Sequence, residues 1–161
     1  MSKIEPQSLP ERSLLNRYAG AGTYADCFVA EVTGVVDLAR YVEAFYTTPL
    51  FKLERLILKL AAKRSTDAQA RQVAAGAIEA FAAWRAENRS ADQLVMGDVY
   101  GNTRSWFMVE PVADSEPART RLYFGTGVSA AAMRRPSFRT LLGFHVWYSK
   151  ALLRAACRRL G

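Results

Sequence analysis

His145 is the only histidine in the chain, and it lies on the apolar side of a stretch with helical spacing near the C-terminus. An imidazole that faces a core is either a hydrogen-bonded core residue or, where burial tunes its pKa, a group that transfers protons. Asp26 and Asp98 fall in strand-like patterns, where they either end strands in water or face inward. A carboxylate that faces inward needs a partner such as Arg104, because an unpaired buried charge is costly.

Aromatic side chains offer a second chemistry, the recognition of an apolar or aromatic molecule. Trp106 falls in a predicted strand, and Tyr148 follows His145 by three residues in a predicted helix. Rings of this kind either fill a core or line a ligand pocket in which a few polar groups fix the orientation. We therefore predict a ligand site lined by Arg104, Trp106, His145 and Tyr148, in which Arg104 binds an acidic group of the ligand.

The sequence does not indicate cofactor or metal chemistry. With one histidine and two cysteines, a histidine cluster for a metal is not possible, and no tight acidic cluster replaces it. Cys157 follows His145 by 12 residues of one predicted helix, which places the two about 18 Å apart. The chain also lacks a Gly-rich phosphate loop, a nucleophile elbow and a CxxC pair. We expect neither a cofactor nor a metal site.

The net charge of +7 is unevenly distributed along the chain. All 15 acidic residues lie at or before Glu116, whereas residues 117–161 contain nine basic residues. Such a segment either attracts an anionic partner or places cations at a helix C-terminus, where they suit the helix dipole. No nucleic-acid-binding motif accompanies the charge, so we expect no specific nucleic acid partner. Weak contact with an anionic surface stays open, because residues 50–63 read as a basic amphipathic helix and the last predicted helix carries Lys150, Arg154 and Arg158 on one stripe.

Length and composition are those of one globular domain. The chain has 161 residues, of which half are apolar and 23% are charged. Residues 1–10 lack the apolar core of a signal peptide, and no apolar run reaches the ~18 residues that span a bilayer. We therefore expect a cytoplasmic protein in which Cys27 and Cys157 are free thiols, with one disulfide as the alternative. Residues 1–22 are interpreted as an N-terminal arm, and residues 23–161 as a single α+β domain.

The periodicity of apolar residues predicts a strand, three helices, three strands and a final helix. In chain order these elements cover Tyr24–Val32, Leu38–Tyr46 and residues 50–63, 66–88, 93–100, 103–110, 119–128 and 137–160. Local signals mark the helix starts. Asp37 and Ser137 are predicted N-caps, and Thr66 with Gln69 forms a capping box.

Gly101-Asn102 predicts a two-residue hairpin that would pair Leu94 with Val109. Both faces of this hairpin are partly apolar, so the sheet is either covered on both sides or lines a cavity. In the last predicted strand, Gly125 and Gly127 indicate a bend or a bulge.

These elements make an α+β fold, with an antiparallel sheet of about four strands covered by helices and a long C-terminal helix packed across it. The element order, the segments Ala25–Phe28 and Leu142–Ala156 and the paired helices before Ser65 resemble a bacterial family of unknown function. That family is similar in plan to the helix-grip (START-like) domains, and the resemblance covers roughly residues 24–160. It implies a curved sheet with a ligand cavity under the last helix.

Three functions stay open at this point. The first is a non-catalytic domain that binds a small apolar or aromatic molecule between the sheet and the last helix. The second is an enzyme of the same fold, of the lyase or cyclase type, with His145 or Asp98 as the acid–base group. The third is an interaction or membrane-surface protein that acts through the basic C-terminal segment.

Overall fold

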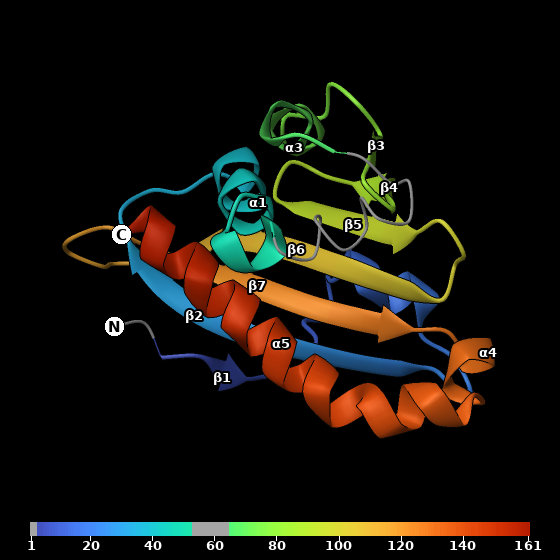
Figure 1. The fold of residues 1–161 in the computed structure, drawn as a ribbon. Helices are drawn as coiled ribbons and strands as arrows, with labels where there is room; N and C mark the ends of the chain where they lie inside the picture. The colour runs from blue at the N-terminus through green and yellow to red at the C-terminus, as the bar shows by residue number, and fades with distance from the viewer. Residues whose placement is uncertain (1–2, 53–64) are drawn as a thin grey trace.

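A seven-stranded antiparallel sheet forms the centre of the fold in the computed structural model, which describes residues 3–52 and 65–161 (Figure 1). The strands are β1 Glu5–Pro6, β2 Tyr24–Thr33, β3 Ala80–Phe81, β4 Trp84–Arg89, β5 Gln93–Asp98, β6 Thr103–Pro111 and β7 Arg119–Val128. They lie in the order β1-β2-β7-β6-β5-β4-β3, and every neighbouring pair is antiparallel. The helices are the 3₁₀ helix η1 Leu14–Tyr18 and the α-helices α1 Leu38–Tyr46, α3 Asp67–Ala74, α4 Ala130–Met133 and α5 Pro136–Leu160.

The two faces of the sheet are covered by different parts of the chain. α1 and α5 lie on the side that faces the viewer in Figure 1, where α5 crosses β2 and β7. The N-terminal segment with η1 lies behind the sheet, against β5, β6 and β7. We call these two sides the helix face and the arm face. Both faces of the sheet are therefore covered, which explains why both carry apolar side chains.

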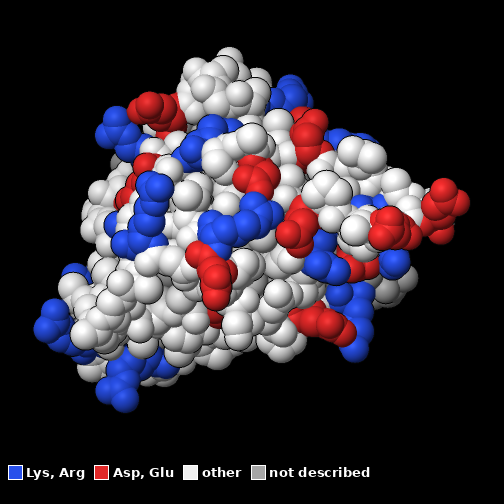
Figure 2. Space-filling model, turned by 180° about the vertical axis from the view of Figure 1, so that it is seen from behind, with Lys and Arg blue, Asp and Glu red and all other residues white. Residues whose placement is uncertain are grey.

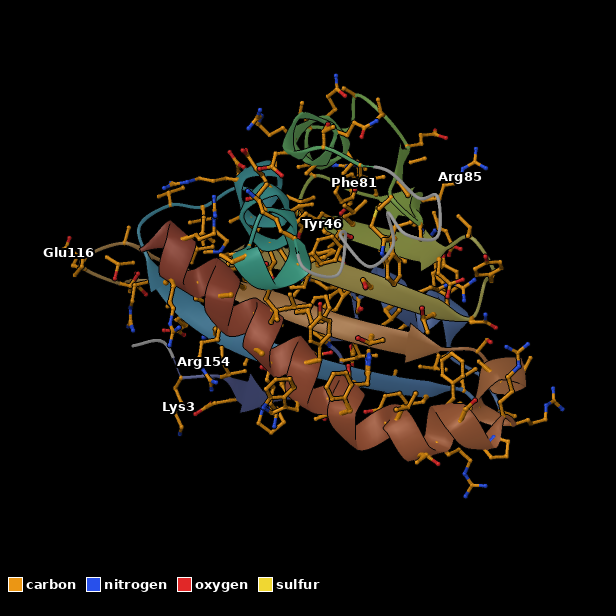
Figure 3. All side chains as sticks on the ribbon, in the orientation of Figure 1. Lys3, Tyr46, Phe81, Arg85, Glu116 and Arg154 are labelled. Atoms are coloured by element: carbon orange, nitrogen blue, oxygen red, sulfur yellow. The ribbon has the colours of Figure 1, made fainter. Side chains whose placement is uncertain are left out.

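The helix face carries the larger core, which is rich in aromatic rings. Phe45 of α1 packs on Phe107 of β6 and Phe124 of β7, with ring centroids 4.9 and 4.7 Å apart. Tyr46 of α1 and Phe81 of β3 lie side by side in the same layer, with ring centroids 5.1 Å apart (Figure 3). Aromatic pairs of this kind stabilise a fold by about 0.5–1.5 kcal/mol beyond the area they bury. They fix α1 against the middle of the sheet.

The arm face carries a smaller core in which Leu15 of η1 packs with buried side chains of the sheet. These are Cys27, Val95, Trp106, Met108 and Tyr123. A side chain at Gly125 would meet the Trp106 ring at 2.9 Å and a backbone carbonyl oxygen at 2.7 Å, so a glycine is needed there. The buried Gln93 accepts hydrogen bonds from the backbone N–H of Leu14 and from Trp106 Nε1, each at 2.9 Å. Packing and hydrogen bonds together attach the N-terminal segment to the sheet.

The predicted helix starts at Asp37 and Thr66 are confirmed. The Asp37 carboxylate accepts a hydrogen bond from the first turn of α1, and Thr66 with Gln69 forms the capping box of α3. Both devices act within four residues, so sequence alone identifies them. The helix predicted over residues 50–63 lies mostly outside the described residues, because residues 53–64 are not among them.

The predicted strands at 24–32 and 119–128 are confirmed as β2 and β7. The hairpin of β5 and β6 is also present, but Leu94 pairs with Phe107 and not with Val109. The register differs by two residues because a longer turn, closed by hydrogen bonds to the Asp98 carboxylate, replaces the two-residue turn. A shift of two residues leaves each side chain on its predicted face, since side chains alternate with a period of two.

The helix predicted over residues 66–88 is wrong beyond Ala74. There α3 ends, Gly76 adopts a φ of +78° that favours glycine, and the chain turns into β3 and β4. Arg89 of β4 donates hydrogen bonds back to the carbonyl oxygens of Val73 and Ala74 at the end of the helix. With β1, these two strands make a sheet of seven strands where about four were predicted.

Two smaller predictions are also corrected. The pairing of β7 with β2 and β6 runs without a register shift through Gly125 and Gly127, so the bulge, one of the two alternatives predicted there, is absent. Ser137 does not cap the last helix, because α5 begins at Pro136 with Arg135 at its N-cap. No helix in the described ranges 3–52 and 65–161, α5 included, is long and apolar enough to cross a bilayer.

Candidate functional site

A groove of about 280 Å³ lies between the N-terminal half of α5 and the adjoining ends of β6 and β7. Thr103 of β6 and Val128 of β7, which are paired in the sheet, line its strand side. α5 lines the other side with side chains that are mostly apolar, which include Phe138, Leu141, Leu142, Phe144, His145 and Tyr148. An apolar cavity of about 150 Å³ is enough to bind benzene. The groove therefore has room for a substituted ring or a short branched chain.

The two halves of α5 differ in how closely they contact the sheet. All of its buried residues lie in the C-terminal half, from Ser149 to Leu160, and none of residues 136–148 is fully buried. Beneath the C-terminal half the helix face of the sheet offers apolar side chains such as Phe28 and Leu122. Apolar helix side chains pack closely on such a surface.

Beneath the N-terminal half of α5, the helix face of the sheet is polar. β-sheet pairing places Asp26 of β2 beside Thr126 of β7, and Thr126 beside Ser105 of β6. Burying this polar row under apolar side chains would leave hydrogen-bonding groups without partners, which is costly. The groove follows from this change in the character of the sheet.

Asp26 is held in place by two hydrogen bonds. One carboxylate oxygen accepts from the Tyr24 hydroxyl at 3.0 Å, and the other accepts from the Thr126 backbone N–H at 2.9 Å. The Thr126 hydroxyl lies close enough to favour the carboxylate, but it is buried and makes no hydrogen bond with any residue that the structure describes. Burial, together with the Asp26 charge, raises the pKa of Tyr24, so its hydroxyl stays protonated and continues to donate.

His145 of α5 interacts electrostatically with Asp26 of this polar row. Burial lowers the pKa of His145, and the Asp26 carboxylate partly offsets that effect. Burial raises the pKa of Asp26, and the hydrogen bond from Tyr24 and the charge of His145 act in the opposite direction. A pKa below its ordinary value leaves the imidazole neutral at pH 7, with Nε2 lying 3.5 Å from the Ser149 hydroxyl.

The residues predicted to line one ligand site are divided between the two faces of the sheet. His145 and Tyr148 line the groove on the helix face. Trp106 is fully buried on the arm face, where its Nε1 donates to Gln93. Arg104 also points to the arm face and donates to Glu87 at 2.6 Å.

The prediction that Arg104 binds an acidic ligand group beside His145 is therefore wrong in its geometry. Arg104 and Trp106 occupy even positions of β6, whereas Thr103 and Ser105 on the helix face occupy odd positions. The guanidinium of Arg104 lies 4.2 Å from the centre of the Tyr18 ring, so its neighbours are η1 and β4. Among the described residues that line the groove, there is no lysine or arginine.

The Asp98 carboxylate stabilises the turn between β5 and β6. Its carboxylate oxygens accept hydrogen bonds from the backbone N–H groups of Tyr100, Asn102 and Thr103 and from the Thr103 hydroxyl, at 2.7–3.2 Å. A carboxylate with so many donors is a structural element of the turn. Asp26, and not Asp98, is the carboxylate that interacts with His145.

Several groove residues were not recognised from the sequence. Thr103, Val128, Phe138 and Leu141 carry no signal of chemistry, and only the packing of α5 on the strand ends brings them together. For Asp26 the sequence allows either a strand end in water or an inward position, and the structure shows the inward position, on the helix face beside Thr126. The missing information was that α5 sets His145 over that part of the strand.

The cysteines offer no reactive thiol to the site. Cys27 lies in the core of the arm face and Cys157 in the core of the helix face, and both are free. Burial raises the pKa of Cys27 to about 12 and that of Cys157 to about 11, so both stay protonated at neutral pH. In the part of the chain that the structure describes, no three His, Cys, Asp or Glu residues converge to hold a metal ion.

Comparison with known protein families, with characterised proteins and with solved structures gave no match for this chain. Its fold is an α+β fold with an antiparallel sheet and a long C-terminal helix. The argument for function therefore comes from the groove and from the surface around it.

Proposed function

We propose that this protein is a non-catalytic domain, helix-grip-like in plan, that binds a small apolar or aromatic molecule under the N-terminal half of α5. The observation that supports it most is the groove of about 280 Å³, whose mostly apolar walls contain the imidazole of His145. Ligand sites in proteins commonly combine apolar walls with a few placed polar groups. The resemblance to the family of helix-grip plan is part of the same proposal.

The polar groups near the groove favour a neutral ligand that bears a hydroxyl group. His145 is uncharged at pH 7, and Asp26 behind it carries negative charge when ionised. An acidic ligand would meet this carboxylate without a described lysine or arginine in the groove to compensate. A hydroxyl group, by contrast, hydrogen-bonds with an imidazole nitrogen in either direction.

Matched pairs of small molecules test this proposal. We expect aromatic and isoprenoid alcohols to raise the Tm in a thermal-shift screen and to bind in isothermal titration calorimetry. The carboxylic acid of the same skeleton should bind at least about tenfold more weakly, which corresponds to ~1.4 kcal/mol. Fatty acids and aromatic acids belong in the same screen, because tighter binding of the acids would contradict the assignment of the ligand.

Two substitutions in the groove and one outside it locate the site. Leu141→Asp introduces a charge into the groove wall, and His145→Ala removes the imidazole from it. Both should reduce the affinity at least about tenfold. Arg154→Ala changes an exposed residue of α5 away from the groove and should leave affinity unchanged (Figure 3). Equal binding by all three variants, or no binding by any compound, would reject the groove as the site.

The interaction of Asp26 with His145 favours a second candidate, an enzyme that uses His145 as its acid–base group. A carboxylate near an imidazole strengthens the imidazole as a base. If a bound molecule is converted, mass spectrometry of the incubated ligand will show it. His145→Gln should then abolish conversion while binding persists, and Asp98→Asn should leave conversion intact, because Asp98 serves its turn. A bound ligand recovered unchanged would leave only the binding function.

A further inference from the structure

The N-terminal half of α5 exposes a patch of large apolar side chains. Leu141, Phe144 and Trp147 follow each other at three-residue steps and are 58%, 60% and 60% exposed. The rings of Phe144 and Trp147 pack together with centroids 5.7 Å apart. We call these three residues the apolar patch. Isolated exposed apolar side chains are normal, but a continuous set on one helix marks a surface that contacts something apolar.

Basic residues without acidic partners flank the apolar patch. Arg134, Arg135 and Arg139 are exposed, and their side chains make no hydrogen bond or ion pair with any residue in 3–52 or 65–161. Arg154 lies farther along the exposed side of α5 (Figure 3). Residues 117–161 contain no acidic residue, so α5 itself supplies no counter-charge to its basic residues.

The arm face shows the opposite arrangement. Arg119 and Arg121 both contact Glu31, Arg121 also contacts Glu110, and Arg12 contacts Glu110 and Asp92. Figure 2 shows acidic and basic side chains intermixed on this side of the molecule. Among the described residues, Arg134, Arg135 and Arg139 therefore carry positive charge without an acidic partner at the junction of α4 and α5, beside the apolar patch.

We propose that the N-terminal half of α5 docks on the surface of an anionic phospholipid bilayer. Trp, Phe and Leu side chains enter the boundary between headgroups and acyl chains, and neighbouring arginines bind the headgroup phosphates. The two features lie on the same helix and on the exposed side of the fold. Docking through the apolar patch and the arginines does not require α5 to leave the sheet, because only its exposed N-terminal half would contact the bilayer.

Two other occupants fit this surface less well. A second copy of the chain, docked through the same patch, would bring the basic residues of one α5 close to those of the other, and like charges repel. A nucleic acid would leave the apolar patch without a partner, since phosphate contacts come from basic side chains. A bilayer surface satisfies both the apolar and the basic part.

The apolar patch also borders the groove, because Leu141 and Phe144 line it. Docking would place the opening of the groove at the membrane surface, from which an apolar ligand would enter. This last step rests on the proposed binding function, whereas the docking itself does not.

Vesicle binding tests the docking with the full-length protein. We expect co-sedimentation with vesicles of phosphatidylcholine mixed with phosphatidylglycerol, little with phosphatidylcholine alone, and a decrease as salt is added. The exposed Trp147 should show a blue shift of its fluorescence on binding, since its ring moves from water into the interface. Trp147→Phe should keep the binding and lose most of that shift.

Substitutions separate the two parts of the surface. Arg135→Glu with Arg139→Glu, and separately Phe144→Ser with Trp147→Ser, should each weaken partition into anionic vesicles at least about tenfold. Arg17→Glu changes an exposed residue of η1 on the arm face and serves as the matched control, with an effect of about twofold or less. Circular dichroism and melting curves verify that each variant is folded.

Specific results would overturn the docking. These results are equal binding to neutral and anionic vesicles, binding that does not decrease as salt is added, or wild-type binding by both double variants. A dimer in light scattering that Phe144→Ser with Trp147→Ser converts to a monomer, without vesicle binding by the wild type, would assign the patch to a second copy. Salt-sensitive binding of a single-stranded RNA without vesicle binding would assign the arginines to nucleic acid. His145→Ala should leave vesicle binding intact, so the docking and the ligand-binding proposal fail separately.

Discussion

At the scale of single residues, Asp26 and His145 are two buried groups whose ionisation states affect each other. Asp26 belongs to β2 and His145 to α5, and the fold sets them near each other without an ion pair or a hydrogen bond between them. Burial disfavours the charged form of both, while their opposite charges favour it. The charge on each group therefore shifts the pKa of the other.

The lone histidine makes this interaction measurable. We expect an NMR titration of the His145 imidazole to give a pKa below the ordinary value, because burial lowers it. Asp26→Asn should lower that pKa further, because the carboxylate that favours the imidazolium is gone. Asp114→Asn, in an exposed loop, is the control and should leave the titration unchanged. A titration that is the same with Asp and Asn at position 26 would show that the two groups do not interact.

Stability should depend on pH in a way that Asp26→Asn alters. The pKa of Asp26 is raised in the fold, so the folded state binds its proton more tightly than the unfolded state does, and the free energy of unfolding rises as pH falls through the folded pKa. His145 acts in the opposite sense. Its pKa is lowered in the fold, so stability is lost as pH falls through the unfolded value of about 6.5.

Asp26→Asn removes the first contribution. At pH 7 the variant should be more stable than the wild type by on the order of 1 kcal/mol, the usual size of a single substitution's effect. The difference should shrink as the pH falls through the folded pKa of Asp26 and its proton is bound. Urea unfolding at several pH values between about 4 and 8 measures it. A difference that is constant over this range would mean that Asp26 is not ionised at a cost in the fold.

At the scale of elements, Gly125 of β7 lets the backbone of β2 and the Trp106 ring of β6 lie close to its own strand. Gly125 lies where a Cβ atom would meet a backbone carbonyl at 2.7 Å, whereas nothing lies within 4 Å of a Cβ atom at Gly143 in α5. Gly125→Ala should cost about 1–3 kcal/mol, because backbone and the Trp106 ring must move. Gly143→Ala should stabilise by about 0.5–1 kcal/mol, since alanine is the better helix former. Thermal unfolding of both variants tests this, and equal effects would contradict the close approach.

Elements with local signals were predictable from the sequence, and elements fixed by distant contacts were not. The capping box at Thr66 and the alternation in β2 and β7 depend only on near neighbours. The spacing of Val73, Phe81 and Trp84 also fits a single helix, and only Gly76 and the return of Arg89 show that the helix stops. Sequence periodicity does not distinguish one helix from a helix followed by two strands that bury the same positions.

The candidate site divides in the same way. His145 and Tyr148 were predicted on the inner side of the last helix, and they line the groove. Arg104 and Trp106 were assigned to the same pocket because both faces of their strand read as apolar or mixed. Which face belongs to α5 depends on where η1 packs, and that contact joins residues about 90 positions apart, as Leu15 and Trp106 show.

At the scale of the whole molecule, the sheet separates two surfaces with different roles. The arm face is closed by η1, and Arg12, Arg119 and Arg121 on this face are paired with acidic residues. The helix face is closed where α1 and the C-terminal half of α5 pack. The N-terminal half of α5 leaves the groove, the apolar patch and arginines without an acidic partner among the described residues exposed. The arm face is therefore covered, whereas part of the helix face is open for contact.

Because η1 covers the arm face, we expect its packing on the sheet to contribute to the free energy of unfolding of the whole domain. Leu15 is 1% exposed and packs on Trp106, so Leu15→Ala leaves a cavity on the arm face and should cost about 2–5 kcal/mol. Leu141→Ala makes the same chemical change at an exposed leucine and should change the free energy of unfolding by no more than about 0.5 kcal/mol. Urea unfolding, with amide hydrogen exchange of β5, β6 and β7 as a second measure, compares the two. If Leu15→Ala unfolds at the same urea concentration as Leu141→Ala, the arm contributes no more to the fold than the exposed half of α5 does.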